Sequence, residues 1–259
     1  MTNELLKLYD RELREQVEYP EAKKEITQDV VRFKREAPGM SFVSLTYAQE
    51  ADLKRVIQNE LTHFNPAQGR PFTWKVYDHD PLPSLGEKLT ARGFEKDEDR
   101  GDVMIFDVSE APAEKFEMNG LDIRQITSRE GLKDVVTVLD KVWGNSNEWV
   151  YDRLGGHLQI PGYLSIYAGY ADDEPVSIAW TYFPRGQFAT LFAGSTLPEH
   201  RKRGFYTGIL WKRLREIRNR GARFAVVEAG DMSRPIVEKH GFRLLTTVWD
   251  YVWKGNDSV

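Results

Sequence analysis

The chain has 259 residues, a net charge of −4, and hydrophobic and charged fractions of 41% and 29%, which are ordinary values for a soluble protein. The acidic balance, with an isoelectric point near 5.8, argues against general nucleic-acid binding. No cysteine is present, so disulfides, thiolate metal sites and a cysteine acyl-enzyme are excluded.

The first residues, 1–14, alternate apolar and charged side chains as an amphipathic helix does, and they hold no signal-peptide core. No apolar stretch approaches the length that spans a bilayer. We therefore expect a cytoplasmic protein with no membrane partner.

The first half of the chain mixes helical and strand patterns. Leu5 and Leu13 belong to a first predicted helix, and Pro20 is expected to open a second. The apolar residues of this second helix would share one face: Ala22, Ile26, Val30 and Phe33. After a break at Pro38 and Gly39, apolar spacing predicts a strand over 41–47, a helix over 51–64, a strand over 72–77, a helix over 83–94 that ends in Gly-Phe, and a strand over 103–108.

The second half begins after residues 109–114, which are rich in small, charged and proline residues and mark the expected domain boundary. Domains are therefore expected over 1–110 and 118–259. In the second domain the apolar spacing first predicts a strand over 121–126, a helix over 130–142, and a loop and short helix over 145–158. A hairpin of strands 163–170 and 176–183 and a strand over 188–192 are expected next. The remaining elements are a helix that ends near 219, a strand over 224–228, a helix that ends at Gly241-Phe242, and a strand over 244–253.

One stretch of the second half carries chemistry. Arg201-Lys-Arg-Gly204 places positive charge and a glycine where a buried strand gives way to a helix. The N–H groups and the dipole of a helix start favour an anion, so this turn could cradle a phosphate. A basic run at a helix terminus is also compatible with an ordinary solvated face.

The turn resembles a known motif. Arg201-x-x-Gly204-x-Tyr206, preceded by Thr196-Leu-Pro198, is similar to the acyl-CoA-binding motif of the GCN5-related N-acetyltransferases (GNATs). Residues 233–242 resemble the later helix of that family, which ends in Gly-Phe. The resemblance implies an α+β fold with a mixed sheet in the C-terminal domain. The N-terminal half repeats the element order but has acidic residues in 48–52 where the motif would lie, which suggests a degenerate GNAT-like unit.

The family's chemistry implies direct transfer of an acetyl group from acetyl-CoA to a primary amine of a small molecule or peptide. By the resemblance, one strand and turn would hold the donor: Thr196, Arg201, Lys202, Arg203, Gly204, Phe205, Tyr206 and Thr207. Gly194 falls where the family holds the thioester carbonyl on a bulged strand. A glycine in a strand is also typical of a bulge alone.

The motif does not by itself identify the general base and the general acid of the transfer. Glu228 ends an apolar strand and could act as a base if half-buried, or it could simply cap a turn or pair with an arginine. Asp231 is a weaker candidate. The family's usual tyrosine acid is replaced by Val237, so Ser233, Tyr206 or water would have to serve.

For the acceptor, we expect a pocket framed by the loop 143–151 and by the strand residues Trp180 and Tyr182. Trp143, Trp149 and Trp180 would form its apolar walls, although Trp180 could equally be core. Four polar side chains could receive the amine: Asn145, Asn147, Glu148 and Asp152. No His-x-x-x-His spacing indicates a metal site. Two other functions stay open: a non-catalytic acyl-CoA-binding or regulatory module, and transfer in which the N-terminal half helps bind a larger acceptor. A surface strand near Val248 could pair subunits in a homodimer.

Overall fold

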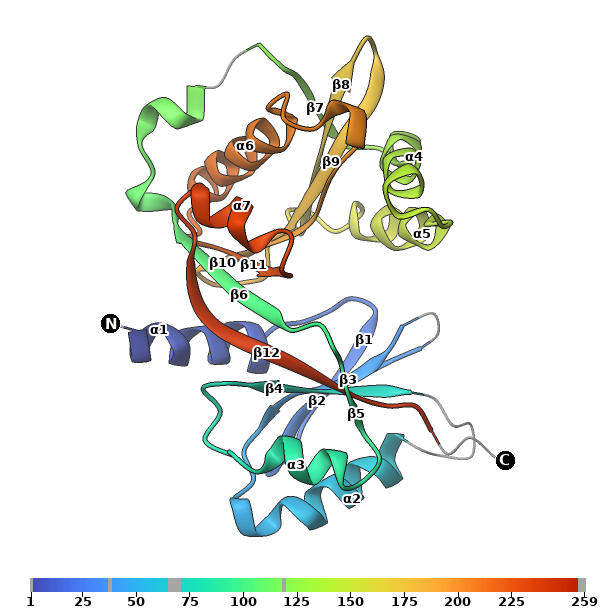
Figure 1. Cartoon of the computed structure of the whole chain (residues 1–259), viewed down its shortest axis with the longest axis vertical. Helices are drawn as coiled ribbons and strands as arrows, with labels where there is room; N and C mark the ends of the chain where they lie inside the picture. Colours follow the sequence, from blue (N-terminus) through green and yellow to red (C-terminus); the bar gives the residue numbers. More distant parts are fainter. Residues whose placement is uncertain (1, 37–38, 65–70, 118–119, 256–259) are drawn as a thin grey trace. The chain divides into compact units, whose positions relative to one another are not determined.

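The computed structural model of the chain describes residues 2–36, 39–64, 71–117 and 120–255 (Figure 1). They form two compact units: unit 1 comprises Met1–Met104 and Glu228–Val259, and unit 2 comprises Ile105–Val227. Two strands run across the division, β6 (Gly101–Asp107) and β11 (Phe224–Ala229). The α+β class with a mixed sheet is as expected.

Unit 1 contains a sheet whose strands lie in the order β1-β2-β3-β4-β12, with β5 beside β12. Its elements are α1 (Thr2–Tyr9), a π-helical turn η1 (Asp10–Glu15), β1 (Ala22–Ile26), β2 (Val30–Arg35), β3 (Ser41–Thr46), η2 (Glu50–Asp52), α2 (Leu53–Phe64), β4 (Phe72–Tyr77), α3 (Leu85–Thr90), β5 (Glu95–Lys96), α7 (Arg234–Lys239) and β12 (Arg243–Trp253). Most of the expected elements are confirmed within two or three residues at each end. The expected break at Pro38 and Gly39 lies partly outside the described residues.

The second expected helix is wrong, because residues 22–35 form an antiparallel hairpin of β1 and β2. Ala22, Ile26 and Val30 are spaced by four, which places them on one face of a helix and equally on one face of a strand. The Thr27 hydroxyl accepts hydrogen bonds from the N–H groups of Asp29 and Val30, which closes the turn between the strands.

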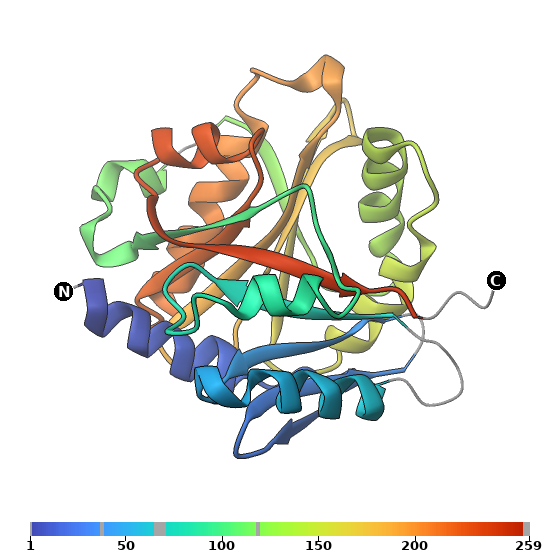
Figure 2. The same ribbon diagram turned by 60° about the horizontal axis from the view of Figure 1, so that its bottom comes forward.

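Both faces of the unit 1 sheet are covered. Helices α2 and α3 lie together on one face (Figure 2), where they bury Trp74 and Phe72 of β4 and Tyr251 of β12. Val31 and Phe33 of β2 point to the other face and pack with Val17. After Val30 the burial along β2 alternates, with Val31 and Phe33 buried, Arg32 half-buried and Lys34 exposed.

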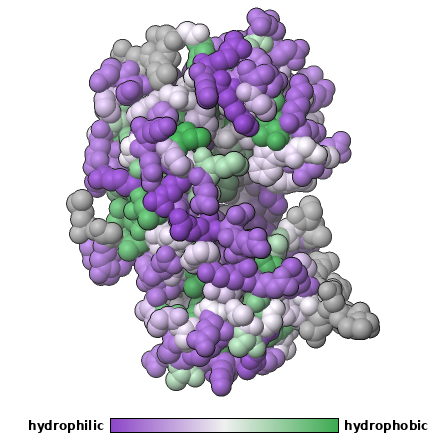
Figure 3. All heavy atoms as spheres, viewed as in Figure 1, coloured by the Kyte–Doolittle hydropathy of each residue, from purple (hydrophilic) through white to green (hydrophobic). Residues whose placement is uncertain are grey.

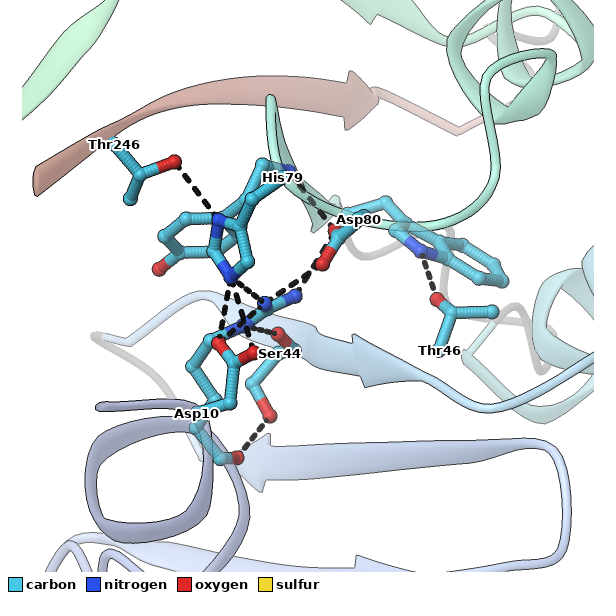
Figure 4. Close-up of polar contacts among 9 residues, drawn as sticks. Asp10, Ser44, Thr46, His79, Asp80 and Thr246 are labelled. Carbon is cyan, nitrogen blue, oxygen red and sulfur yellow. Dashed lines mark hydrogen bonds and ion pairs between the residues drawn. The ribbon is translucent and has the colours of Figure 1, made fainter. Parts of the chain in front are cut away.

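A buried polar network joins the N-terminal helical segment to this sheet (Figure 4). Arg14 is 1% exposed and donates to both carboxylate oxygens of Asp80, at 2.7 and 3.0 Å, and to Asp10 at 2.8 Å. The His79 ring lies between Asp10, 2.9 Å from Nε2, and the Thr246 hydroxyl, 2.8 Å from Nδ1. Each charge in the network has a partner, as a buried ion cluster requires.

Unit 2 is built on strands in the order β11-β10-β9-β8-β7. Its elements are η3 (Val108–Glu110), η4 (Ala113–Glu117), β7 (Asp122–Ile126), α4 (Leu132–Trp143), α5 (Glu148–His157), β8 (Leu164–Ala171), β9 (Glu174–Tyr182), β10 (Phe188–Thr196), η5 (Pro198–His200) and α6 (Phe205–Asn219). Figure 1 shows α4 and α5 on one face of β7, β8 and β9, and α6 on the other.

Glycines let α6 approach the sheet closely. A Cβ at Gly208 would lie 2.7 Å from Ile123 Cδ1, and one at Gly169 would lie 2.8 Å from Phe205 Cδ1. At these distances a side chain at either position would force its neighbour to shift. The N-terminal turn of α6 is thereby fixed against β7 and β8.

The two units divide the chain differently from the expected domains. Residues 228–259 group with unit 1 because β12 pairs with β4 along six residues, from Val248 opposite Tyr77 to Trp253 opposite Phe72. Val248 is 1% exposed, so β12 is not the free surface strand that we expected to join subunits. A homodimer and the roles assigned to 1–110 and 118–259 stay predictions.

Hydrophilic residues cover most of the face that Figure 3 shows. No helix among the described residues has the length and apolar character needed to cross a membrane. Within the same residues, no three histidine, aspartate or glutamate side chains are grouped as metal ligands.

Candidate active site

The site begins where β10 loses its neighbour. The parallel ladder between β10 and β11 joins Phe188, Ala189 and Thr190 to Phe224, Ala225 and Val226. Beyond Thr190, strand β10 continues to Thr196 alongside β9 only, as far as the described residues of unit 2 show. The edge of β10 over 191–196 is therefore open to pairing with an extended ligand.

A bulge re-aims this open edge. The register between β10 and β9 shifts between Phe192 and Ser195, and Ala193 has a left-handed φ of 51°. The expected bulge at Gly194 is confirmed. Bulges of this kind turn backbone N–H and C=O groups away from the ladder, which makes them available to a ligand.

Strand β10 leads into the basic turn and then into α6. Gly204 precedes the first residue of the helix and has φ +91°, and Lys202 also has a positive φ, of 61°. A helix of this length leaves the N–H groups of its first turn without intrahelical carbonyl partners, and its dipole is positive at this end. The turn thus has the backbone geometry of an anion cradle.

Three exposed cations surround the turn: Arg201, Lys202 and Arg203. The Arg201 Nε donates to the Thr196 carbonyl at 3.2 Å, which ties the turn to the end of β10. Arg203 lies 2.9 Å from His200 Nδ1. Because these guanidinium groups are exposed and lack carboxylate partners among the described residues, their charge remains available to an anion.

Tyr206 stands in the motif where the GNAT family usually has a small residue. A Cβ at Gly194 would lie 2.8 Å from Tyr206 Cε2, so the ring packs directly on the bulge. Burial raises the pKa of the Tyr206 hydroxyl, although the nearby Arg213 opposes this shift. Tyr206 thus keeps its proton at neutral pH and can donate it.

Arg213 of α6 lies behind the bulge, and nothing in the sequence indicated that it would be buried at the site. Its side chain is 2% exposed and donates to the carbonyls of Trp180, at 3.2 Å, and Phe192, at 3.4 Å. No carboxylate faces it among the described residues of unit 2, and its Nε has no hydrogen-bond partner. Desolvation lowers the pKa of this guanidinium to about 10.

Aromatic side chains gather on the opposite face of β9 and β10, which α4 and α5 cover. Trp180 is directly opposite Phe192 in the register, so the two share this face. Trp180 is 7% exposed within the core, and its indole N–H has no partner in the described structure. Phe192 is 46% exposed, and its ring contacts Tyr182 at a centroid distance of 5.3 Å.

The other residues predicted for the acceptor lie at the end of α4 and the start of α5. Trp143 is 60% exposed, and its indole N–H lies 3.4 Å from the Ser195 hydroxyl, beside the bulge. Asn145 is exposed and accepts from the Asn147 side chain. Trp149 is 46% exposed under the guanidinium of Arg153. Of these three residues, Trp143 has a hydrogen bond to β10 within the described part of the chain.

Glu228 and Ser233 lie in unit 1. The Glu228 side chain is 50% exposed, packs over Gly101, and lies 3.7 Å from Lys75 Nζ. It lines a polar pocket of about 230 Å³ in unit 1 with three further carboxylates, those of Asp97, Asp99 and Asp250. The Ser233 hydroxyl donates to the Gly230 carbonyl at 3.2 Å. The catalytic roles of both residues stay predictions.

Sequence reasoning placed Tyr182 at the acceptor pocket but missed its partner, His157. His157 ends α5, is 5% exposed, and lies 3.0 Å from the Tyr182 hydroxyl through Nδ1. The two residues are separated by a hairpin, so spacing gave no sign of their contact. From the sequence alone, a histidine near the C-terminus of a helix suggests a favourable interaction with the helix dipole and nothing more.

Comparisons with known proteins agree with this geometry. No family model matches the chain, and no curated protein matches it in sequence. A GCN5-related N-acetyltransferase from Kribbella flavida has a similar structure, with a TM-score of 0.67, 14% identity, and coverage of 99% of this chain and 95% of that one. A tandem GNAT protein from the clavulanic acid biosynthesis pathway gives a TM-score of 0.63, 12% identity, and coverage of 94% and 86%. The chain therefore has the fold of the GCN5-related N-acetyltransferases over nearly its whole length.

Proposed function

We propose that this chain is an N-acetyltransferase that moves an acetyl group from acetyl-CoA to a primary amine. The observation that carries the proposal is the continuous path formed by the open edge of β10, its bulge at Ala193 and Gly194, and the basic turn at the start of α6. The GNAT fold of the structural neighbours supports acyl transfer as the class of reaction.

The donor would lie along this path in an extended form. Its pantetheine amides match the spacing of backbone groups on an unpaired strand edge, and its pyrophosphate matches the cationic helix start. Gly204 would let the backbone approach the phosphates, since its conformation is strained for any other residue. Arg201 and Arg203 would add charge-assisted hydrogen bonds.

The transfer needs no covalent enzyme intermediate, in keeping with a chain that lacks cysteine. The amine nitrogen forms a bond to the thioester carbon, and the carbon–sulfur bond then breaks. Backbone N–H groups at the bulge are suited to stabilise the oxyanion. Tyr206 packs on the bulge and is protonated at neutral pH, so its hydroxyl is available to protonate the departing thiolate.

Calorimetric titration with acetyl-CoA and with CoA tests the donor site. We expect the wild type to bind both, and Gly204→Glu to weaken binding at least tenfold, because it places a carboxylate and a strained backbone in the cradle. Gly221→Glu is the matched control, since Gly221 follows the other end of α6 with a similar φ of 82°. Failure of the wild type to bind, or equal binding by Gly204→Glu, would overturn the proposal.

Transfer itself is tested with a panel of amines and a thiol-release assay. The panel should contain benzylamine, tyramine, spermidine and a short peptide with a free N-terminus. Acetylation of any member, lost in Gly204→Glu and kept in Gly221→Glu, supports the proposed activity. Acetyl-CoA binding without transfer to any amine in a broad panel would instead favour a binding module.

A further inference from the structure

A histidine and a tyrosine form a hydrogen-bonded pair in unit 2 outside the donor path. The His157 imidazole is 5% exposed and lies 3.0 Å from the Tyr182 hydroxyl through Nδ1. Tyr163 and Tyr182 each meet the imidazole edge to face, with ring centroids 5.4 Å away. The aromatic walls hold the imidazole in one orientation and keep it from bulk water.

The pair lies beside the point where the donor path opens. Tyr182 is directly opposite Thr190, and Thr190 is the last residue of β10 that pairs with β11. The Tyr182 ring also contacts Phe192, the residue at which the bulge begins. A buried imidazole is therefore one hydrogen bond away from a phenol at the start of the open edge.

We propose that His157 is the proton acceptor of the transfer and that it acts through Tyr182; this rests on the proposed acetyltransferase function. Tyr182 donates its proton to His157 Nδ1, and the incoming ammonium passes a proton to the Tyr182 oxygen. The resulting neutral amine attacks the thioester carbon and forms the carbon–nitrogen bond. When the carbon–sulfur bond breaks, Tyr206 gives its proton to sulfur, which leaves as the CoA thiol, and the second proton of the nitrogen replaces the one that Tyr206 lost. The imidazolium later returns its proton to solvent through Tyr182.

The chemistry of the pair fits this task better than a lone carboxylate in water. Neutral imidazole is the side chain whose proton affinity lies closest to neutral pH, so it can accept and release a proton in each cycle. The Tyr182 phenol supplies a short path for that proton. Tyr182 is the catalytic residue of the pair, and His157 is a positioning residue that accepts the proton from it.

The test is the pH dependence of kcat/KM with the best amine of the panel. In the wild type we expect kcat/KM to fall toward acidic pH, because a protonated His157 can no longer accept the proton. His157→Gln and the nearly isosteric Tyr182→Phe should each lose this limb and lower kcat by about 10²-fold or more. The double variant should lose no more than either single variant, because the two residues act as one unit.

Two variants control for loss of a histidine or a phenol elsewhere. His63→Gln removes a histidine of unit 1, and Tyr170→Phe removes a strand hydroxyl that bonds to Asp134. Both should keep the wild-type profile, and all variants should keep the affinity for acetyl-CoA. A retained acid limb in Tyr182→Phe and His157→Gln, with transfer intact, overturns the relay alone. Absence of acetyl-CoA binding in the wild type overturns the proposed function, and the relay with it.

Discussion

Replacement of Arg213 by methionine should make the protein more stable and bind acetyl-CoA less tightly. Burial lowers the pKa of this guanidinium from the ordinary value of an arginine to about 10. A lowering of that size corresponds to roughly 3 kcal/mol of free energy that disfavours the charged side chain in the fold. Because the folded-state pKa lies below the unfolded value, the penalty acts at every pH below about 10 and is relieved only above it.

Methionine removes this penalty and fills a similar volume, but it also removes the hydrogen bonds to the carbonyls of Trp180 and Phe192. At 3.2 and 3.4 Å these bonds are long, so together they contribute about 1–2 kcal/mol, less than two well-formed bonds from a charged group would. We therefore expect the free energy of unfolding to rise by roughly 1–2 kcal/mol. The urea midpoint should rise, while the dependence of the unfolding free energy on urea concentration stays unchanged. The carbonyl of Phe192 would then lack its anchor at the start of the bulge, so the affinity for acetyl-CoA should fall.

Urea unfolding followed by circular dichroism, with calorimetric titration of acetyl-CoA, measures both effects. Arg218→Met is the matched control, since Arg218 is exposed on the same helix, where its guanidinium contacts the Phe116 ring. This control should be indistinguishable from the wild type in both assays. An Arg213→Met protein that is less stable than the wild type would refute the argument that the buried charge is poorly compensated.

Three further expectations follow from the packing and the charges. Gly194→Val should weaken acetyl-CoA binding at least tenfold by calorimetry, because its side chain must displace the Tyr206 ring, and Tyr206→Ala in the same chain should restore part of the affinity. Arg14→Met should lower the free energy of unfolding in urea by about 3–5 kcal/mol, because Asp80 then stays buried without its partner. Hydrogen bonds from His79 and the charge of Arg14 outweigh burial and lower the pKa of Asp10. The Asp10 carboxylate therefore stabilises the fold fully above its pKa in the unfolded chain, and this stabilisation is lost as the pH falls through its lower pKa in the folded state. Urea midpoints between pH 5 and pH 2 should consequently fall less steeply in Asp10→Asn than in the wild type.

The sequence predicted correctly those elements whose apolar residues fit a single period, either that of a helix or that of a strand. Strand β4 has the expected bounds, and α6 begins where the Arg201–Gly204 turn indicated. The pattern failed at residues 22–35, where a spacing of four fits a helix and a strand alike, and the turn chemistry of Thr27 decided between them. Local signals thus determine an element only where a single period fits.

The candidate site shows a similar division. The turn at Gly204 and the bulge at Gly194 could be predicted because each depends on residues next to each other in the chain. Tyr182 was expected at the acceptor pocket, but its contact with His157 could not be predicted, since it forms only when α5 packs on β9. Arg213 carries no signal of its own in the sequence, and it is buried because it lies among the apolar residues of α6 that face the sheet, such as Leu210 and Leu214. No local property distinguishes a buried arginine from a solvated one.

The pairing of β12 with β4 has a consequence for synthesis of the chain. Val248 and Tyr77 are neighbours in the sheet of unit 1, yet all of unit 2 lies between them in the sequence. A ribosome therefore releases the whole of unit 2 before unit 1 can acquire its last strand. Until then β4 presents an unpaired edge next to the apolar Trp74 and Phe72, a surface that favours association with other nascent chains. Translation pauses within 105–227 would lengthen that exposure, so chaperone dependence should be greatest while this insert is being made.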